Sequence, residues 1–113
     1  MPQPHSPFDL IRSWADTDRP FAAYELPDGS RLDVSYADQL DRSLRTASVL
    51  AHDGVRPGDR VHVHLPNGPQ FLDVWFGADA IGAVIVPTNP LASSAELEHF
   101  LGDSGAVVSV VAD

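Results

Sequence analysis

The feature that most constrains this chain is a regular alternation of helix-like and strand-like segments that begins at Ser35. Apolar residues first recur every three or four positions and then every second position, and short connections separate the two patterns. This order is typical of right-handed crossovers that build a parallel sheet. The predicted fold class is therefore α/β, with parallel-sheet units in the order α-β-α-β-α-β.

Capping residues and glycines give the expected boundaries of these segments. A helix is predicted after Ser35, which with Asp38 forms the spacing of a capping box, and it should stop at Gly54. The later elements are a strand at residues 61–65, a helix from about 69 to 82, a strand at 83–86, a helix after 93 and a strand at 106–111.

Two of these elements carry a prediction about burial. Residues 83–86 are continuously apolar, so we expect this strand to be buried on both faces of the sheet. The helix after Ser93 should turn Leu97, Phe100 and Leu101 toward the protein interior.

The amino-terminal part of the chain follows a different pattern. Residues 1–7 contain three prolines and are expected to form an irregular arm. A short helix should follow, with Ser6 as its cap, and end before Pro20. Residues 21–26 and 31–34 flank a turn rich in Pro and Gly, so we predict a β-hairpin there. We therefore divide the chain into residues 1–19, an arm with a helix, and residues 20–113.

The charge balance argues against several classes of partner. The chain has 16 acidic and 7 basic residues, which gives a formal net charge of -9. A protein of this charge lacks the basic surface of a nucleic-acid binder. All 7 basic residues are Arg, so no lysine is present to bind phosphate, form a Schiff base or act as a catalytic amine.

Cysteine content and hydropathy point to a cytoplasmic protein. The chain has no Cys, which excludes disulfides, thiolate zinc sites and thiol nucleophiles. The amino terminus lacks the basic start and apolar core of a signal peptide, and no apolar run is long enough for a transmembrane segment. We expect a cytoplasmic location.

Pairs of glycines offer a first candidate for phosphate binding. Gly77 and Gly82 have the separation of a Walker loop, but Ala83 stands where the lysine is needed, and both glycines belong to a predicted helix or its end. Gly54 and Gly58 are interpreted as a helix stop and a turn. Neither pair predicts a nucleotide site.

Two histidines on one predicted strand offer a second candidate. His62 and His64 are two positions apart, so both rings point to the same face of the sheet. A metal site needs a third ligand, and the sequence does not place His52, His99 or Asp59 beside them. We therefore predict a polar sheet face with partly exposed histidines and no zinc.

The remaining candidates lie on helices. Asp73 and Asp79 are six positions apart and fall on different sides of their helix, so they are expected to be solvated charges rather than an acid/base pair. Trp75 and Phe76 could stack on a ligand ring, but core packing is the favoured interpretation. Residues 103–105 are interpreted as a turn after a helix. By residue chemistry alone, we predict no catalytic, cofactor-binding or metal-binding residue in this stretch.

Four stretches resemble the AMP-forming adenylate-forming enzymes, a family that includes acyl-CoA synthetases, luciferases and peptide-synthetase adenylation domains. Residues 34–40 resemble the first core motif of the family, and residues 76–87 resemble its second. Residues 54–61 and 65–71 are similar to the stretch between these motifs. The similarity extends in unbroken order over residues 20–113, which the resemblance identifies as the amino-terminal part of an AMP-binding domain.

Other residues resemble the fatty acyl-CoA synthetase branch of the family. They lie at 87–91, 96–99 and 103–106. Amino-acid-activating members usually carry Asp where Asn89 stands, so the resemblance favours a carboxylic acid without an α-amino group. The chain departs from the family at His62 and His64, where apolar residues are common, and this argues against full burial of the strand.

The resemblance implies an ATP-dependent acyl-CoA ligase that uses Mg²⁺ and coenzyme A. In the family, a carboxylate and ATP give an acyl-adenylate and pyrophosphate, and the thiol of coenzyme A then displaces AMP. The phosphate loop with its lysine and the adenine- and ribose-binding motifs lie downstream of position 113. No catalytic residue is therefore carried over to this chain, which we expect to supply scaffold and to be inactive alone.

Two alternatives remain open. The chain could be a separate, non-catalytic polypeptide that docks onto a complementing carboxy-terminal part, or a decayed remnant of such an enzyme. It could also be a small flavodoxin-like binding domain. That fold needs about five parallel strands, whereas three are predicted after the hairpin.

Overall fold

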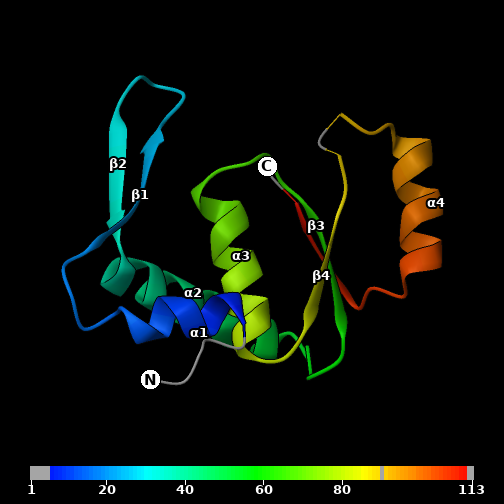
Figure 1. Ribbon diagram of the computed structural model, residues 1–113. Coiled ribbons are helices and arrows are strands. Elements are labelled where there is room, and N and C mark those ends of the chain that lie inside the picture. Colours follow the sequence, from blue (N-terminus) through cyan, green and yellow to red (C-terminus); the bar gives the residue numbers. More distant parts are fainter. Residues whose placement is uncertain (1–5, 90, 112–113) are drawn as a thin grey trace.

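A computed structural model describes residues 6–89 and 91–111 of the chain (Figure 1). Helices and strands alternate from the second helix onward, as the sequence predicts. In chain order the elements are α1 (Pro7–Ser13), β1 (Pro20–Glu25), β2 (Arg31–Ser35), α2 (Tyr36–His52), β3 (Arg60–His64), α3 (Pro69–Ala80), β4 (Val84–Pro87), α4 (Ser94–Ser104) and β5 (Val108–Val111).

The helix starts lie where the capping residues indicate. The Ser6 hydroxyl accepts a hydrogen bond from the Asp9 amide at the start of α1. Ser35 and Asp38 form a reciprocal capping box on α2, in which each side chain accepts from the other residue's amide. The Ser93 hydroxyl accepts from the Glu96 amide at the start of α4. Local sequence therefore determines these boundaries.

The strands form two separate sheets. β1 and β2 make the predicted antiparallel hairpin, in which Glu25 pairs with Arg31 beside the turn. The other three strands form a parallel sheet in the order β4-β3-β5, so β3 is the central strand. The α/β fold class with a parallel sheet is confirmed.

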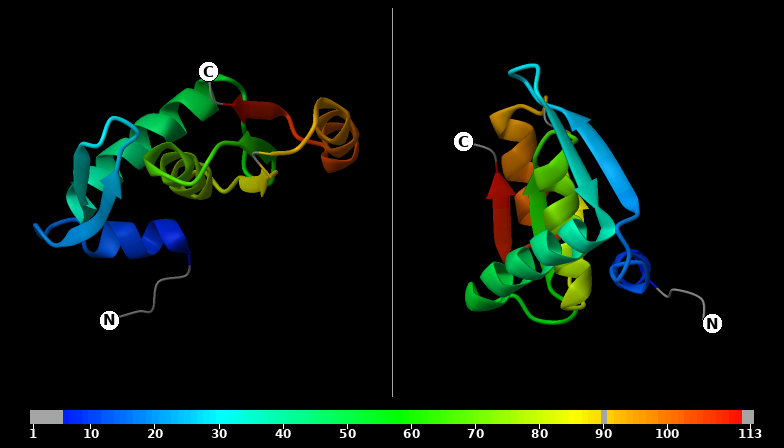
Figure 2. Two further views of the ribbon diagram at one scale, coloured as in Figure 1. Left: turned by 90° about the horizontal axis from the view of Figure 1, so that it is seen from above. Right: turned by 90° about the vertical axis from the view of Figure 1, so that its left-hand side faces the viewer.

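Two helical layers enclose the parallel sheet from opposite sides (Figure 2). Val61 and Val63 of β3 are fully buried against α2 and α3, in a core that also contains Leu50, Val74 and Ala78. α4 lies beyond the other face, toward which His62 and His64 point. This placement follows from the crossovers, since β3 continues through α3 to one edge strand and β4 returns through α4 to the other.

The prediction that residues 83–86 are buried on both faces is wrong. Ile85 packs against the core below α3, but Val84 on the α4 side is 55% exposed. β4 is an edge strand, and α4 does not cover this end of its outer face. A run of apolar residues therefore does not by itself establish burial on both sides.

The predicted inner face of α4 is described only in part. Leu97 is half-buried, and the side chains of Phe100 and Leu101 lie outside the described residues, as do residues 1–5 of the predicted arm. On the other side of the molecule the hairpin is anchored by Phe21, whose ring packs edge-to-face against Tyr36 and Phe76.

Candidate functional site

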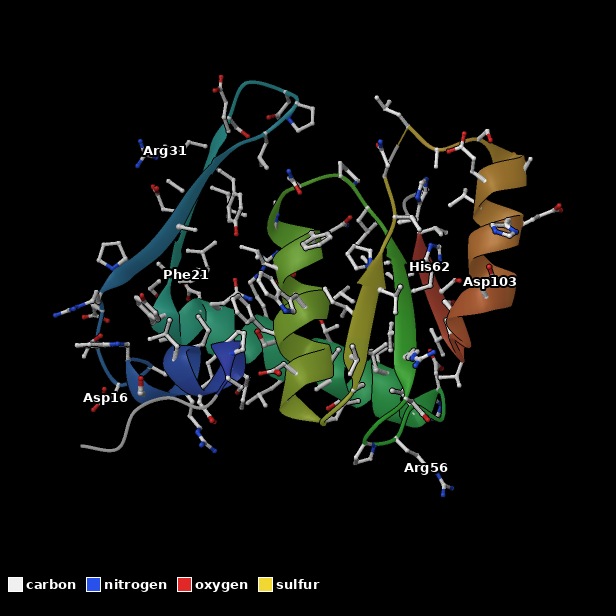
Figure 3. All side chains as sticks on the ribbon, turned by 45° about the vertical axis from the view of Figure 1, so that its right-hand side comes forward. Asp16, Phe21, Arg31, Arg56, His62 and Asp103 are labelled. Carbon is white, nitrogen blue, oxygen red and sulfur yellow. The ribbon has the colours of Figure 1, made fainter. Side chains whose placement is uncertain are left out.

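Four polar side chains from all three parallel strands meet on the α4 side of the sheet. His62 lies at the centre: its Nδ1 is 2.9 Å from Ser109 Oγ on β5, and its Nε2 is 2.9 Å from Thr88 Oγ1 just after β4. Thr88 Oγ1 also lies 2.8 Å from His64 Nδ1. We call these four residues the histidine network. Figure 3 shows His62 on the side of the sheet that faces α4.

The prediction of partly exposed histidines is confirmed for His64, which is half-buried, and is wrong for His62. His62 is only 1% exposed, and the strand around it is buried from Val61 to Val63. Burial lowers the pKa of His62, and the neighbouring His64 lowers it further. The histidine is accommodated because hydroxyl groups satisfy both ring nitrogens, as buried polar groups require. Ser109 is the register partner of His62 on β5, whereas Thr88 lies just beyond β4, whose register partner of His62 is Val86. Sequence reasoning missed these two hydroxyls because the strand register was not known.

The histidine network does not have the composition of a metal site or a catalytic triad. Among the described residues, no three His, Asp, Glu or Cys side chains lie together as a possible metal site. Ser109 and His62 have the contact of a nucleophile and its base, but the second nitrogen of His62 faces Thr88 instead of a carboxylate. The arrangement joins strands and supplies no oriented base.

A second polar cluster joins α2 to α3 and overturns the prediction for Asp73. Both carboxylate oxygens accept from Arg42, at 3.0 Å from Nε and 2.9 Å from Nη2, and Gln39 Nε2 donates to the same carboxylate at 3.1 Å. Gln39 also donates to the buried hydroxyl of Ser43 at 3.0 Å. We call Gln39, Arg42, Ser43 and Asp73 the helix-pair network.

Asp73 in this network is a structural ion-pair partner and not a solvated charge, since its side chain is only 15% exposed. The hydrogen bond to Asp73 raises the pKa of Arg42. Burial raises the pKa of Tyr24, and the charge of Asp73 adds to this effect. Gln39, Arg42 and Ser43 were missed in the sequence because they sit at polar positions beside an apolar stripe, where exposure is the usual outcome.

Asp79 is likewise not a solvated charge. Its Oδ2 accepts the backbone N–H of Phe8 at 2.9 Å, which attaches the start of α1 to the end of α3. Asp73 and Asp79 therefore serve separate partners, and they do not form an acid/base pair. The expectation of core packing holds for Phe76, which is buried, whereas Trp75 stacks on it and remains 39% exposed.

The candidate glycines have structural explanations. Gly77 lies inside α3 where it crosses α2, and a Cβ there would come within 3.0 Å of Ser43 O and Thr46 Cβ. Gly82 follows the helix with a φ of +77°, which favours glycine. Gly54 and Gly58 also have positive φ, as a helix stop and a turn. Residues 103–105 are not a turn after the helix, because Asp103 and Ser104 belong to the last turn of α4 and Gly105 is its left-handed cap.

The histidine network and the helix-pair network hold structural elements together.

Within the part of the chain that the structure describes, no helix combines the length and apolar character needed to cross a membrane.

Comparison with known proteins gives a consistent family assignment. The family model described as AMP-binding enzyme matches residues 12–113. A feruloyl-CoA synthase from an Amycolatopsis species is 44% identical over 77 residues, which cover 68% of this chain and 16% of that protein. A crotonobetaine/carnitine–CoA ligase from Salmonella typhi is 40% identical over 86 residues, which cover 72% of this chain and 17% of that protein.

Solved structures show the same relationship at the level of the fold. The fatty acyl-CoA synthetase of Mycobacterium tuberculosis superposes with a TM-score of 0.81 at 31% identity, over 92% of this chain and 20% of that chain. The matched region is the amino-terminal part of such enzymes. This chain spans about a sixth of the length of the curated relatives it matches. The resemblance inferred from the four sequence motifs is confirmed.

Proposed function

This chain belongs to the AMP-binding enzyme family, and we propose that it is the amino-terminal portion of an ATP-dependent acyl-CoA ligase. The observation that carries the proposal is the agreement among relatives: a feruloyl-CoA synthase, a crotonobetaine/carnitine–CoA ligase and a fatty acyl-CoA synthetase. These proteins differ in the acyl group that their names specify, but each name specifies a coenzyme A thioester or its ligase. We therefore propose the type of reaction, the joining of an acid to coenzyme A, and leave the identity of the carboxylic acid open.

The proposed reaction joins a carboxylic acid to coenzyme A in two displacements. A carboxylate oxygen attacks the α-phosphorus of ATP, an O–P bond forms, and pyrophosphate leaves. The coenzyme A sulfur then attacks the acyl carbon, a C–S bond forms, the thiol proton passes to solvent or a base, and AMP leaves. Asn89, at a position where amino-acid-activating relatives usually carry Asp, favours an acid without an α-amino group.

The described residues do not fit the phosphate or Mg²⁺ sites that this reaction needs. The chain contains no Lys, and the Arg42 guanidinium is already bound by Asp73. The carboxylates of Asp73 and Asp79 accept from separate partners, and neither belongs to a cluster of three possible ligands in the described ranges. We therefore derive no step of the reaction through these residues and propose a scaffold role.

A complementing part of the large domain would extend the parallel sheet at β5. This strand is paired only with β3, so its outer backbone edge is free in the described sheet. Val107 and Val111 at this edge are more than half exposed. Uncovered strand edges of this kind pair readily with another strand. We also propose a cytoplasmic location, where ATP and coenzyme A are available.

Two preparations test this proposal: the longest protein that contains this chain, and residues 1–113 alone. In the longer protein, we expect ATP–pyrophosphate exchange that depends on a carboxylic acid, and an acyl-CoA product once coenzyme A is added. α-Amino acids serve as the matched substrate control and should not support exchange.

The two preparations separate the ligase proposal from the scaffold proposal. Failure of the longer protein to form any acyl-CoA from a panel of aromatic, short-chain and long-chain acids contradicts the ligase proposal. Measurable exchange by residues 1–113 alone contradicts the scaffold proposal and leaves the ligase proposal intact.

A further inference from the structure

The histidine network joins three strands that are far apart in the sequence. His62 and His64 belong to β3, Thr88 follows β4, and Ser109 belongs to β5. The two imidazole rings stack with centroids 6.2 Å apart. A buried His62 beside a half-buried His64 departs from the apolar residues that resemblance to the family leads us to expect, so the pair is a property of this chain.

The hydroxyl of Thr88 couples the protonation of the two rings. It has one hydrogen, so it can donate to only one of His62 Nε2 and His64 Nδ1 and must accept from the other. The neutral network satisfies this condition, because one ring can present a bare nitrogen and the other an N–H. If both rings are protonated, both nitrogens are donors, and the Thr88 hydrogen has no acceptor on either ring.

Charge acts in the same direction as this hydrogen-bond constraint. His62 is 1% exposed, so its charged form loses hydration that the unfolded chain would provide. Two imidazolium rings 6.2 Å apart repel each other as well. Among the described residues, Arg60 of β3 and the His99–Asp103 pair of α4 are titratable groups on this face, where they line a hollow together with Val86 and Ser104. By sequence, β4 and β5 carry no titratable side chain.

We propose that the histidine network is an acid-sensitive clasp, which holds β4 and β5 to β3 when neutral and loosens the α4–β5 unit as the solution becomes acidic. The α4–β5 unit is the part of the structure that can separate from β3 when the histidine network opens. α4 is attached to the sheet through few described contacts, such as the 2.7 Å hydrogen bond from Arg60 Nη1 to Ser104 O. Local opening is expected where a segment has few such contacts.

The direction of the pH effect follows from proton binding. Folding lowers the pKa of His62, so the open state binds more protons than the closed state below the ordinary histidine value of about 6.5. Stability of the closed unit is therefore full above that pH and decreases as the solution becomes more acidic, until the pH falls below the folded pKa. The change stops there because both states are then protonated.

Hydrogen exchange of the full chain between pH 8 and pH 5 tests the clasp. After correction for intrinsic exchange rates, the open fraction of the β5 amides should rise about tenfold for each unit by which folding lowers the histidine pKa. Amides of α2, such as that of Leu50, serve as the internal reference and should change less. An equal change in β5 and α2 overturns the proposal.

Two variants separate the clasp from other titrating groups. His62→Val should remove most of the pH dependence in β5, because no proton can then be taken up at the centre of the network. His99→Gln removes a histidine from the same face, but its exposed ring pairs with Asp103 and does not belong to the histidine network, so the wild-type pH dependence should persist. The reverse result, with His99→Gln removing the dependence, overturns the proposal.

A measurement on the wild type keeps the proposal testable if His62→Val does not fold. NMR titration should show the His62 ring taking up its proton below the ordinary histidine value of about 6.5, and the His64 signals should change when it does. Thr88→Val should abolish this change in the His64 signals. A His62 ring that takes up its proton at or above the ordinary histidine value overturns the proposal.

Discussion

Helices α3 and α4 lie on opposite faces of one sheet, yet the two sides are built differently (Figure 2). On the α3 side, apolar side chains and the ion pair of the helix-pair network hold α2, α3 and β3 closely together. On the α4 side, the sheet presents a histidine network, and Val84 and Val111 remain largely exposed. The comparison teaches that one sheet can combine a rigid face with a loosely covered one. The predictions below test that contrast.

The largest effect is expected when the ion pair on the α3 side loses its acceptor. Asp73→Ala leaves the buried Gln39 and the partly buried Arg42 without their carboxylate, so the free energy of unfolding should fall by about 2–3 kcal/mol. Urea unfolding measures this change.

The matched control is an ion pair on the outer surface of the same helix α2. Arg45 and Asp41 are 78% and 60% exposed, and their pair lies at 2.8 Å. Arg45→Ala should change the free energy of unfolding by less than about 1 kcal/mol. Equal effects of the two substitutions would show that the helix-pair network does not stabilise the α2–α3 contact.

Gly77→Ala tests how closely α3 approaches α2. The new Cβ would meet Ser43 O and Thr46 Cβ at 3.0 Å, and these groups belong to a packed helix that cannot easily move. Overpacking of this kind outweighs the gain in helix propensity, so the free energy of unfolding should fall by about 1–2 kcal/mol. Thermal unfolding checks this, and a rise in melting temperature contradicts the close approach.

Loss of a helix cap should have a smaller effect that differs between the two sides. Ser35→Ala removes one half of the reciprocal capping box on α2 and should reduce the free energy of unfolding by about 1 kcal/mol. Ser93→Ala removes a cap on α4, which packs less closely against the rest of the fold than α2 does, so this substitution should reduce the free energy of unfolding by less. Chemical denaturation should therefore show the larger change for Ser35→Ala. The opposite ranking would place α4 in the cooperative core.

The smallest predicted effect has the opposite sign and lies in α4. A Cβ at Gly102 meets no atom within 4 Å, so Gly102→Ala should stabilise the helix by about 0.5 kcal/mol through propensity alone. Slower hydrogen exchange in α4 is the measurement. The same glycine-to-alanine substitution is therefore expected to destabilise α3 at position 77 and to stabilise α4 at position 102. Destabilisation by both substitutions would contradict the contrast between the two faces.

Local signals in the sequence predicted the elements of the fold well. Ser6, Ser35 and Ser93 cap the helices they were expected to cap, and Gly54 and Gly105 adopt positive φ at helix ends. These features depend on the chemistry of neighbouring residues, which the sequence displays directly. The same reasoning predicted Gly77 within a helix and Gly82 at its end, and both places are confirmed.

Several predictions about the environment of polar side chains were wrong, as was the predicted burial of residues 83–86 on both faces. His62 was expected to be partly exposed and is buried, because Ser109 and Thr88, 47 and 26 positions away, satisfy its ring. Asp73 was expected to be solvated and instead binds Arg42, 31 positions away. Without such partners both groups would remain in water. The periodicity of apolar residues and the helix-capping signals do not reveal partners that are this far apart in the sequence.

The sequence by itself determined the α/β class, the positions of helices and strands, and the family, since all three depend on local patterns and ordered motifs. Only the tertiary structure decided the strand order β4-β3-β5, the exposure of Val84 and the burial of His62. The reason is physical. A residue's burial depends on which distant groups fold against it, and a polar group becomes part of the core when those groups can satisfy its hydrogen bonds.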